Sequence, residues 1–274
     1  TGGIEFYHSP KDTPENLSQR TLQHYGAGVL PLVVKLGNAD DQTLANCLKP
    51  GDATFFTLCR GLFIRYSAAL QQTFVILTTI LFFIAIARAR FHSLIKIKAL
   101  LLSSAVTALA ALRSAIIAFA VVYALKQIFH PRTFGPFIVG IPSSELFLLA
   151  IILATASLTR TSRLLRKISA LDRLAGTILV WLLLALLTNF TLPGASYLFM
   201  WPAFFATIAL HAKSRPQAIL LTAAPAALLL APTILLIHQT ITIGIAPVSA
   251  ALIALAISLE PLAPPQNQNV ASKA

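Results

Sequence analysis

The sequence predicts a mainly α-helical membrane protein: a multi-span helical domain of about seven transmembrane helices follows a short strand–turn–helix segment. Hydrophobic residues make up 57% and charged residues 11% of the 274 residues, against about 45–50% and 25% in soluble domains. From Ser67 onward, apolar runs of roughly 18–25 residues follow one another, each long enough to cross a bilayer core. Because these runs lack the strict alternation of a barrel strand, we expect helices.

The first residues predict a short strand and a tight turn. Apart from Glu5, residues Ile4–Tyr7 are β-branched or aromatic, and they lie between a Gly-Gly and a Ser-Pro pair, which is typical of a strand. His8 would stand at the end of this strand. Asp12 or Thr13 would then cap a helix that has Pro14 in its first turn, where a proline costs no hydrogen bond.

His8 and Asp12 would face each other across this turn, an arrangement that suits a metal-ligating imidazole with a carboxylate nearby. On chemistry alone, however, a single histidine beside a tyrosine is more often a hydrogen-bonded structural residue. A zinc site needs three or four ligands, and the neighbouring residues supply no others. The residue types by themselves therefore leave both interpretations open.

Three further elements are expected before the membrane domain. A helix should run from Pro14 to about Leu36, with one apolar face and a kink near Ala27 caused by Pro31. The polar residues 37–52 predict a linker. The apolar and aromatic runs that follow, at 53–58 and 61–66, predict a membrane-proximal strand or hairpin.

The membrane domain is expected to contain seven spans, the fourth and fifth joined by a short turn at Pro193-Gly194. Their approximate limits are 68–87, 99–125, 143–159, 174–192, 195–211, 217–237 and 241–259. The Pro- and Gln/Asn-rich tail, residues 261–274, is expected to be disordered. The chain thus divides into residues 1–36, a linker with strands at 37–66, the seven-helix domain at 67–260 and the tail.

The charge distribution predicts membrane topology rather than nucleic-acid binding. Residues 1–66 carry no net charge, so the whole excess of +12 lies after residue 66, where most of the positive residues stand between the apolar runs. The first, third and fifth loops of the membrane domain hold most of the Lys and Arg residues, which the positive-inside rule assigns to the cytoplasm. Residues 1–66 would then be extracytoplasmic, in the periplasm or a lumen, and the tail from Glu260 would be cytoplasmic.

The segment Tyr7–Leu17, followed by Leu22–Gly26, resembles the end of the catalytic domain in a family of di-zinc exopeptidases. This family includes aminopeptidase Y and the membrane-bound endoplasmic-reticulum and vacuolar metallopeptidases. Its last metal ligand is a His in a Tyr-His-Thr-x-x-Asp-Thr pattern, which His8, Asp12 and Thr13 match, while Ser9 replaces the Thr. The similarity covers about the first 36 residues, and the membrane-bound branch also continues into a multi-span region.

The resemblance implies the C-terminal part of a membrane-anchored zinc exopeptidase, with residues 1–36 as the last strand–turn–helix of its α/β peptidase domain. In the family, two zinc ions share a bridging carboxylate and a glutamate activates the attacking water. Here His8 would be one terminal zinc ligand, and Asp12 and Thr13 would support it or stabilise the turn. We expect the other ligands and the general base to lie before Thr1, so this chain alone should be inactive. Peptide substrates would bind through that domain.

Two other functions fit the residues less closely. In a transporter or channel the membrane bundle itself would be active, and Arg113, a charge near the middle of the second span, would mark its site. Arg113 could also serve only to pair with a polar neighbour, for which Glu145 is a candidate that should lie nearer the membrane surface. In a non-catalytic membrane scaffold, His8 and Asp12 would have no chemical role.

Overall fold

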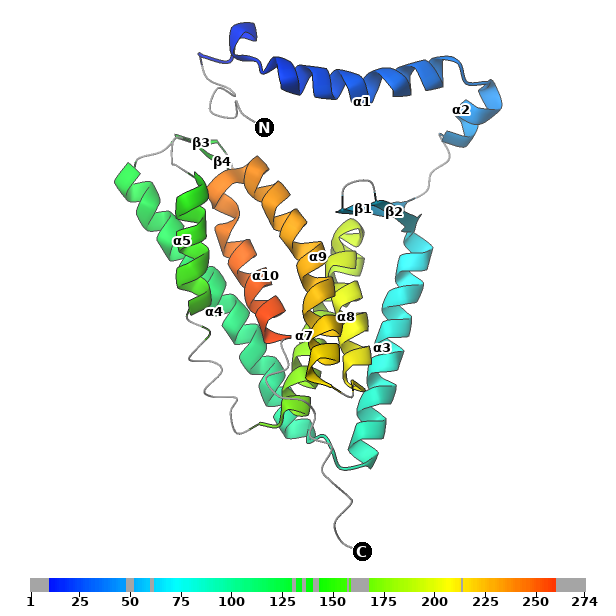
Figure 1. The fold of residues 1–274 in the computed structure, drawn as a ribbon, viewed down its shortest axis with the longest axis vertical. Coiled ribbons are helices and arrows are strands. Elements are labelled where there is room, and N and C mark those ends of the chain that lie inside the picture. Colours follow the sequence, from blue (N-terminus) through cyan, green and yellow to red (C-terminus); the bar gives the residue numbers. More distant parts are fainter. Residues whose placement is uncertain are drawn as a thin grey trace, which may run out of the picture.

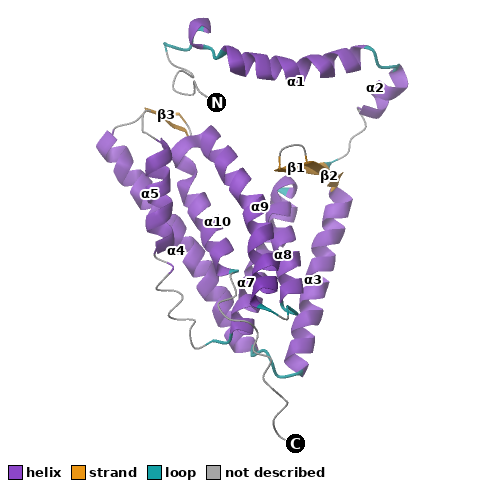
Figure 2. Ribbon diagram, in the orientation of Figure 1, coloured by secondary structure: helices purple, strands orange, loops and turns teal. Residues whose placement is uncertain are grey.

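The computed structural model is mostly helical (Figure 1 and Figure 2). It describes residues 10–47, 52–59, 62–129, 132–134, 137–139, 143–156, 158, 168–212 and 214–259. The predicted strand Ile4–Tyr7, His8 and the tail at 261–274 lie outside these residues. Most of the described chain forms one bundle of helices, and a smaller N-terminal part lies beyond one end of it (Figure 1).

The N-terminal part consists of a 3-10 turn and two helices, and it differs in detail from the expected single helix. The 3-10 helix η1 spans Pro14–Asn16, α1 spans Gln19–Gly37 and α2 spans Asp41–Cys47. The expected start at Pro14 was therefore wrong for the long helix, because Leu17 and Ser18 are extended and the Ser18 hydroxyl caps α1 by accepting a hydrogen bond from Thr21 N (3.3 Å). Helix α1 continues through Pro31.

The expected linker contains helix α2 instead of being wholly irregular. The carboxylate of Asp40 accepts a hydrogen bond from Thr43 N at 2.6 Å, as an N-cap residue does. A hydrogen bond from the Thr43 side chain, together with this one from its backbone, lowers the pKa of Asp40. The polar composition of this segment led to the prediction of a linker, although the sequence contains the Asp-x-x-Thr pattern of a helix cap.

An antiparallel hairpin connects the N-terminal part to the bundle. Strand β1 spans Ala53–Cys59 and β2 spans Leu62–Ser67, with Phe56 opposite Ile64 and an irregularity between Thr57 and Cys59. The hairpin agrees with the strands expected in this region. A second, smaller hairpin is formed by β3 (Arg132–Phe134) and β4 (Phe137–Val139).

Four helices in the described part of the chain are long and apolar enough to cross a membrane. They are α3 (Ala68–Phe91), α4 (Ile97–Phe129), α7 (Ala170–Thr191) and α9 (Arg215–Ile241). The other three expected spans coincide with shorter apolar helices. These are α5 (Ser143–Ala156), α8 (Tyr197–Ala209) and α10 (Ala246–Ser258). The 3-10 turn η3 (Pro193–Ala195) joins α7 to α8 at the expected Pro-Gly turn, and η4 (Thr242–Ile245) joins α9 to α10.

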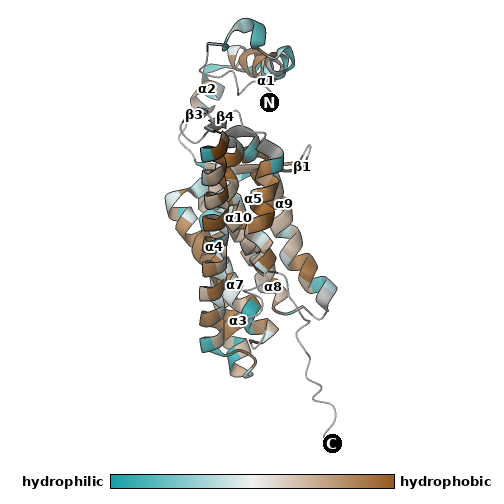
Figure 3. Ribbon diagram, turned by 90° about the vertical axis from the view of Figure 1, so that its left-hand side faces the viewer, coloured by the Kyte–Doolittle hydropathy of each residue, from teal (hydrophilic) through white to brown (hydrophobic). Residues whose placement is uncertain are grey.

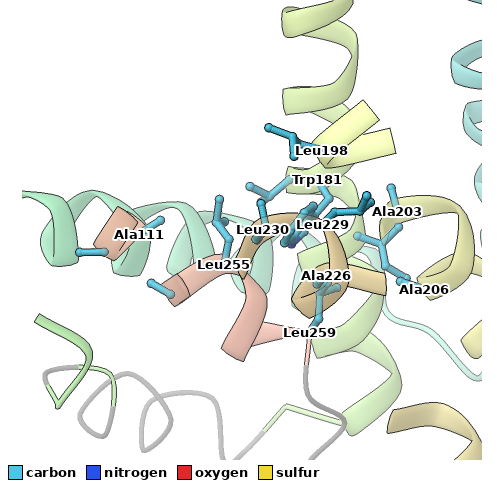
Figure 4. Packing of buried hydrophobic residues seen from close by; sticks show 14 of the residues in the cluster. Ala111, Trp181, Leu198, Ala203, Ala206, Ala226, Leu229, Leu230, Leu255 and Leu259 are labelled. Atoms are coloured by element: carbon cyan, nitrogen blue, oxygen red, sulfur yellow. The ribbon is translucent and has the colours of Figure 1, made fainter. Parts of the chain in front are cut away.

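The bundle has a small-residue core and an apolar outer surface. Trp181, Met200 and many alanines from α4, α7, α8, α9 and α10 are fully buried (Figure 4). Large apolar side chains such as Phe83, Leu109 and Phe119 are about 60% exposed on the outside, and hydrophobic residues dominate the helices of the bundle (Figure 3). Such a continuous apolar surface would be unstable in water, whereas it matches the hydrocarbon core of a bilayer.

The connections of the bundle meet at two opposite ends. The backbone N–H of Lys96, before α4, donates to the Asp172 carboxylate at the start of α7 (2.8 Å), so the predicted first and third loops adjoin each other. At the other end, Gln71 at the start of α3 donates to the carbonyl of Pro193, which lies in the predicted fourth loop. Loops that the sequence assigns to one side of the membrane thus lie at one end of the bundle.

Candidate functional site

The turn that carries the metal-site resemblance is exposed. Asp12 is exposed and Thr13 half-buried, just before η1. The backbone N–H of Thr13 donates to the carbonyl of Lys11 (2.9 Å), and the Asn16 side chain donates to the same carbonyl (2.9 Å) and to the Thr13 hydroxyl (3.4 Å). A hydrogen bond from the Thr13 side chain lowers the pKa of Glu15. Thr13 occupies the N-cap position of η1 without a side-chain bond to a backbone N–H, so its role differs from the expected cap.

No group of three or more His, Cys, Asp or Glu side chains that could hold a metal ion occurs within the part of the chain that the structure describes. His8 lies outside that part. Among the described residues, Asp12 and Thr13, placed next to the predicted ligand by the sequence, belong to a hydrogen-bonded turn. The described residues therefore do not form a zinc site by themselves, and we derive no catalytic step from them.

Arg113 lies on α4, half-buried and directly before Ser114. The Ser114 hydroxyl donates to the carbonyl of Ala154 near the end of α5 (3.4 Å). Glu145 lies nine residues before Ala154 on α5, or roughly 14 Å along the helix axis. Arg113 and Glu145 thus belong to different depths of the α4–α5 pair, as expected from their positions in the two spans.

The base of the first hairpin is fixed to the bundle by a polar and aromatic contact. This contact was not predicted from the sequence. The Thr54 hydroxyl donates to the side-chain oxygen of Gln71 (2.6 Å), and the amide of Gln71 donates to the carbonyl of Pro193. Thr54 and Gln71 are 2% and 1% exposed. Buried polar groups are stable only when hydrogen-bonded, so these two hydrogen bonds hold β1, α3 and η3 together.

Aromatic rings continue the contact between the hairpin and the bundle. Phe56 stacks on Tyr197 of α8, with ring centres 4.2 Å apart and planes 3° apart. Tyr66 of β2 meets Phe74 of α3 edge to face, and Phe74 packs against Trp201. Burial raises the pKa of Tyr66 to about 12, so its phenol is neutral at physiological pH. Aromatic pairs of this kind contribute about 0.5–1.5 kcal/mol each beyond buried area.

The arrangement fixes the first hairpin to one end of the bundle. The inward side chains of the hairpin anchor it to α3 and α8, whereas the outward side chains Phe55 and Phe63 remain about 60% exposed. The strands of this hairpin were predicted from the run of apolar and aromatic residues, but the run does not show which side chains are buried. The hairpin's docking partners Tyr197 and Trp201 could not be predicted, because they come from a distant helix.

Comparisons with known proteins found no family model, no curated protein and no solved structure that matches this chain.

Proposed function

We propose that this chain is the membrane-anchoring C-terminal part of a zinc-dependent exopeptidase, and that its N-terminal residues complete the peptidase domain. The proposal rests on the resemblance of residues 7–26 to the end of such a domain, and the structural observation that supports it is the apolar face of α1, which is exposed among the residues that the structure describes. Five side chains along this face are each more than half exposed: Leu22, Tyr25, Val29, Leu30 and Val33.

Helix α1 is expected to be unstable as a helix unless it packs against another part of the protein. It contains Gly26, Gly28 and Pro31, which disfavour a helix by about 1, 1 and 3 kcal/mol relative to alanine. Isolated helices shorter than about 12–15 residues are marginal in water even with good helix formers, and the 19 residues of α1 exceed this length only slightly. None of the α1 side chains is buried, and a Cβ on Gly26 or Gly28 would meet nothing within 4 Å. The face of α1 therefore fits a helix that packs on the rest of a peptidase domain.

In this proposal the bundle crosses the membrane seven times and carries the peptidase domain on the extracytoplasmic side. The three shorter apolar helices α5, α8 and α10 lie alongside the four long ones (Figure 1), and the basic residues Arg88, Arg90, Lys96 and Lys98 lie around the α3–α4 connection, at the end away from the first hairpin. The positive-inside rule then places that end in the cytoplasm. The hairpin docked on the opposite end would hold the peptidase domain at a fixed height above the bilayer.

His8 is the residue of this chain that we propose as a zinc ligand, through a neutral imidazole nitrogen. When bound, zinc in such peptidases polarises the substrate carbonyl and lowers the pKa of its water. Asp12 and Thr13 would hold the turn that follows the ligand. The remaining donors would come from other parts of the peptidase domain.

The full-length protein with His8→Ala is expected to lose zinc and peptide hydrolysis together. Because a lost metal ligand affects affinity more than a lost supporting residue, hydrolysis should fall by about 100-fold or more. Metal analysis of the purified protein and an exopeptidase assay provide the two measurements. The matched control is His24→Ala, an exposed histidine on α1 that stacks edge to face with Tyr25.

The control should keep both zinc and activity within about twofold of the wild type, since His24 is exposed on α1 and is not proposed as a ligand. Unchanged zinc content and hydrolysis in His8→Ala would overturn the ligand assignment. A wild-type protein that binds no zinc and hydrolyses no peptide would instead identify a non-catalytic membrane scaffold.

A further inference from the structure

A small cavity opens at the basic end of the bundle, where α3 ends and the chain turns toward α4. Its volume is about 100 Å³, and α3, the α3–α4 connection, the start of α7 and the end of α8 all contribute to its wall. The polar lining residues are Arg88, His92 and His211. The walls between them include Ala89, Leu94 and Leu210. All the ionisable side chains among the described residues that line it are basic.

The backbone holds this wall in a defined conformation. After α3, the N–H of Leu94 donates to the carbonyl of Ala89 (2.9 Å) and the N–H of Ser93 to that of Arg90 (2.9 Å), the pattern of a Schellman motif. Ser93 takes the left-handed conformation with φ of 56°, where glycine is usual and other residues are strained. The turn brings Leu94 back beside Ala89, so that both line the cavity with Arg88 and His92.

We propose that this cavity binds a phosphate group, either in the headgroup of an anionic phospholipid or in a free phosphate anion. A guanidinium group presents several N–H donors that match phosphate oxygens in pairs, and each neutral imidazole can donate one more N–H. Arg88, His92 and His211 line the same cavity, and together they offer donors suited to one tetrahedral anion. The volume equals roughly three water molecules in the liquid, which suits a single phosphate group better than a nucleotide.

The location and surrounding charge favour the same ligand. Arg88 lies twenty residues after Ala68, the first residue of α3, or about 30 Å along the helix, which equals the thickness of a bilayer core. Its guanidinium would thus be level with the headgroup phosphates. Lys96, Lys98 and Arg90 lie on the same turn or beside it. Basic pockets between membrane helices at the cytoplasmic side are known to bind anionic headgroups.

Asp172 is the acidic residue nearest in sequence to the cavity wall, and both oxygens of its carboxylate already accept hydrogen bonds within the protein. Asp172 follows the lining residue Leu171, but its two oxygens accept hydrogen bonds from Lys96 N and the Ser169 hydroxyl, both at 2.8 Å. Its charge is therefore held by donors of the protein.

The proposal can be tested with the purified full chain in detergent by native mass spectrometry. Phosphatidylglycerol and phosphatidylcholine are titrated separately, and thermal shifts with inorganic phosphate are measured in phosphatidylcholine nanodiscs. We expect the double variant R88Q/H211Q to weaken binding of the phosphate-bearing ligand by about tenfold or more, because charged hydrogen bonds are lost. The matched control R90Q removes the same charge two residues away on α3 but outside the cavity lining.

A second variant keeps every charge and fills the cavity. Ala89→Leu should block the ligand to a similar extent while folding normally, since Ala89 lies in the wall of an open space. Selective binding of phosphatidylglycerol, lost in R88Q/H211Q and Ala89→Leu but kept in R90Q, identifies a lipid headgroup. A stabilising shift with inorganic phosphate and the same variant pattern, without lipid selectivity, identifies a free anion. Equal weakening in R90Q, or wild-type binding of both ligands in the cavity variants, would overturn the proposal.

Discussion

Replacing Gly176 with alanine is expected to destabilise the bundle by about 3 kcal/mol. An added Cβ would lie 2.5 Å from the carbonyl oxygen of Leu100, 2.7 Å from Ser103 Cβ and 2.9 Å from Ser104 N. Two of these three atoms belong to the backbone of α4, which cannot move aside unless α4 and α7 separate. Helix propensity alone would favour alanine by about 1 kcal/mol, so the sign of the effect distinguishes close packing from intrinsic preference.

Separation of α4 and α7 would also break the hydrogen bonds that join them. The Ser104 hydroxyl donates to the carbonyl of Gly176 (2.9 Å), the Ser103 hydroxyl donates to that of Arg173 (3.2 Å), and the Thr107 and Thr177 hydroxyls lie 3.2 Å apart. Interhelical bonds of this kind contribute about 0.6 kcal/mol each in membrane proteins. Small residues at the interface thus allow both close packing and polar contacts.

Thermal unfolding of the purified protein in detergent measures the effect of Gly176→Ala. A loss of about 3 kcal/mol should lower Tm by roughly 6–12 °C for a chain of this size. Gly194→Ala is the matched control, since a Cβ there would meet nothing within 4 Å, and its Tm should stay within about 2 °C of the wild type. A Gly176→Ala protein as stable as this control would show that α4 and α7 are not packed as described.

Asp172→Ala is expected to have an effect of similar size, about 3 kcal/mol. The Asp172 carboxylate is 3% exposed and accepts hydrogen bonds from Lys96 N and the Ser169 hydroxyl, each at 2.8 Å. Its removal would leave the Lys96 N–H beside buried Ile95 without an acceptor, which costs about 1–3 kcal/mol. It would also remove a negative charge from the first turn of α7, where the helix dipole favours one.

The control for Asp172→Ala is Asp40→Ala, which removes an exposed helix-capping carboxylate from α2. Loss of the bond from Thr43 N (2.6 Å) should cost about 1 kcal/mol within α2 and leave the Tm of the bundle unchanged. Asp172→Asn should fall between the two, because it keeps one acceptor oxygen but loses the charge. Equal Tm values for Asp172→Ala and Asp40→Ala would contradict the role of Asp172 in joining the α3–α4 connection to α7.

The sequence predicted the helices of the bundle better than the way they pack. Apolar runs and the Pro193-Gly194 turn locate α3, α4, α7 and α8. A long uninterrupted apolar segment can satisfy its backbone hydrogen bonds in a membrane in few ways other than as a helix. The buried face of α4 is also visible as small residues at three- and four-residue intervals. Its members include Ser103, Thr107, Ala110, Ala111, Ser114 and Ala118. The sequence could not predict that this face packs on α7 and α10, because the residue pattern of one helix contains no distances to other helices.

Local hydrogen bonds account for the errors near the N-terminus. Thr13 and Pro14 have the composition of a helix start, but the capping bond comes from Ser18, so the helix begins at Gln19. The polar segment at 41–47 looks like a linker until the bond between Asp40 and Thr43 is recognised. The candidate metal ligand, His8, could be proposed only by resemblance, since a zinc site depends on donors from distant parts of a domain.

The most direct test of the proposed architecture measures which side of the membrane each end of the bundle faces. Single cysteines are introduced at the exposed positions Gln42, Lys98, Gly194 and Ser214 after Cys47 and Cys59 are changed to serine. They are then labelled with a membrane-impermeant maleimide before and after permeabilisation. In sealed membranes with the extracytoplasmic face outward, seven spans with an extracytoplasmic N-terminal part predict labelling of Gln42→Cys and Gly194→Cys before permeabilisation, and of Lys98→Cys and Ser214→Cys only after it. Labelling of Gln42→Cys and Lys98→Cys from the same side would contradict the account.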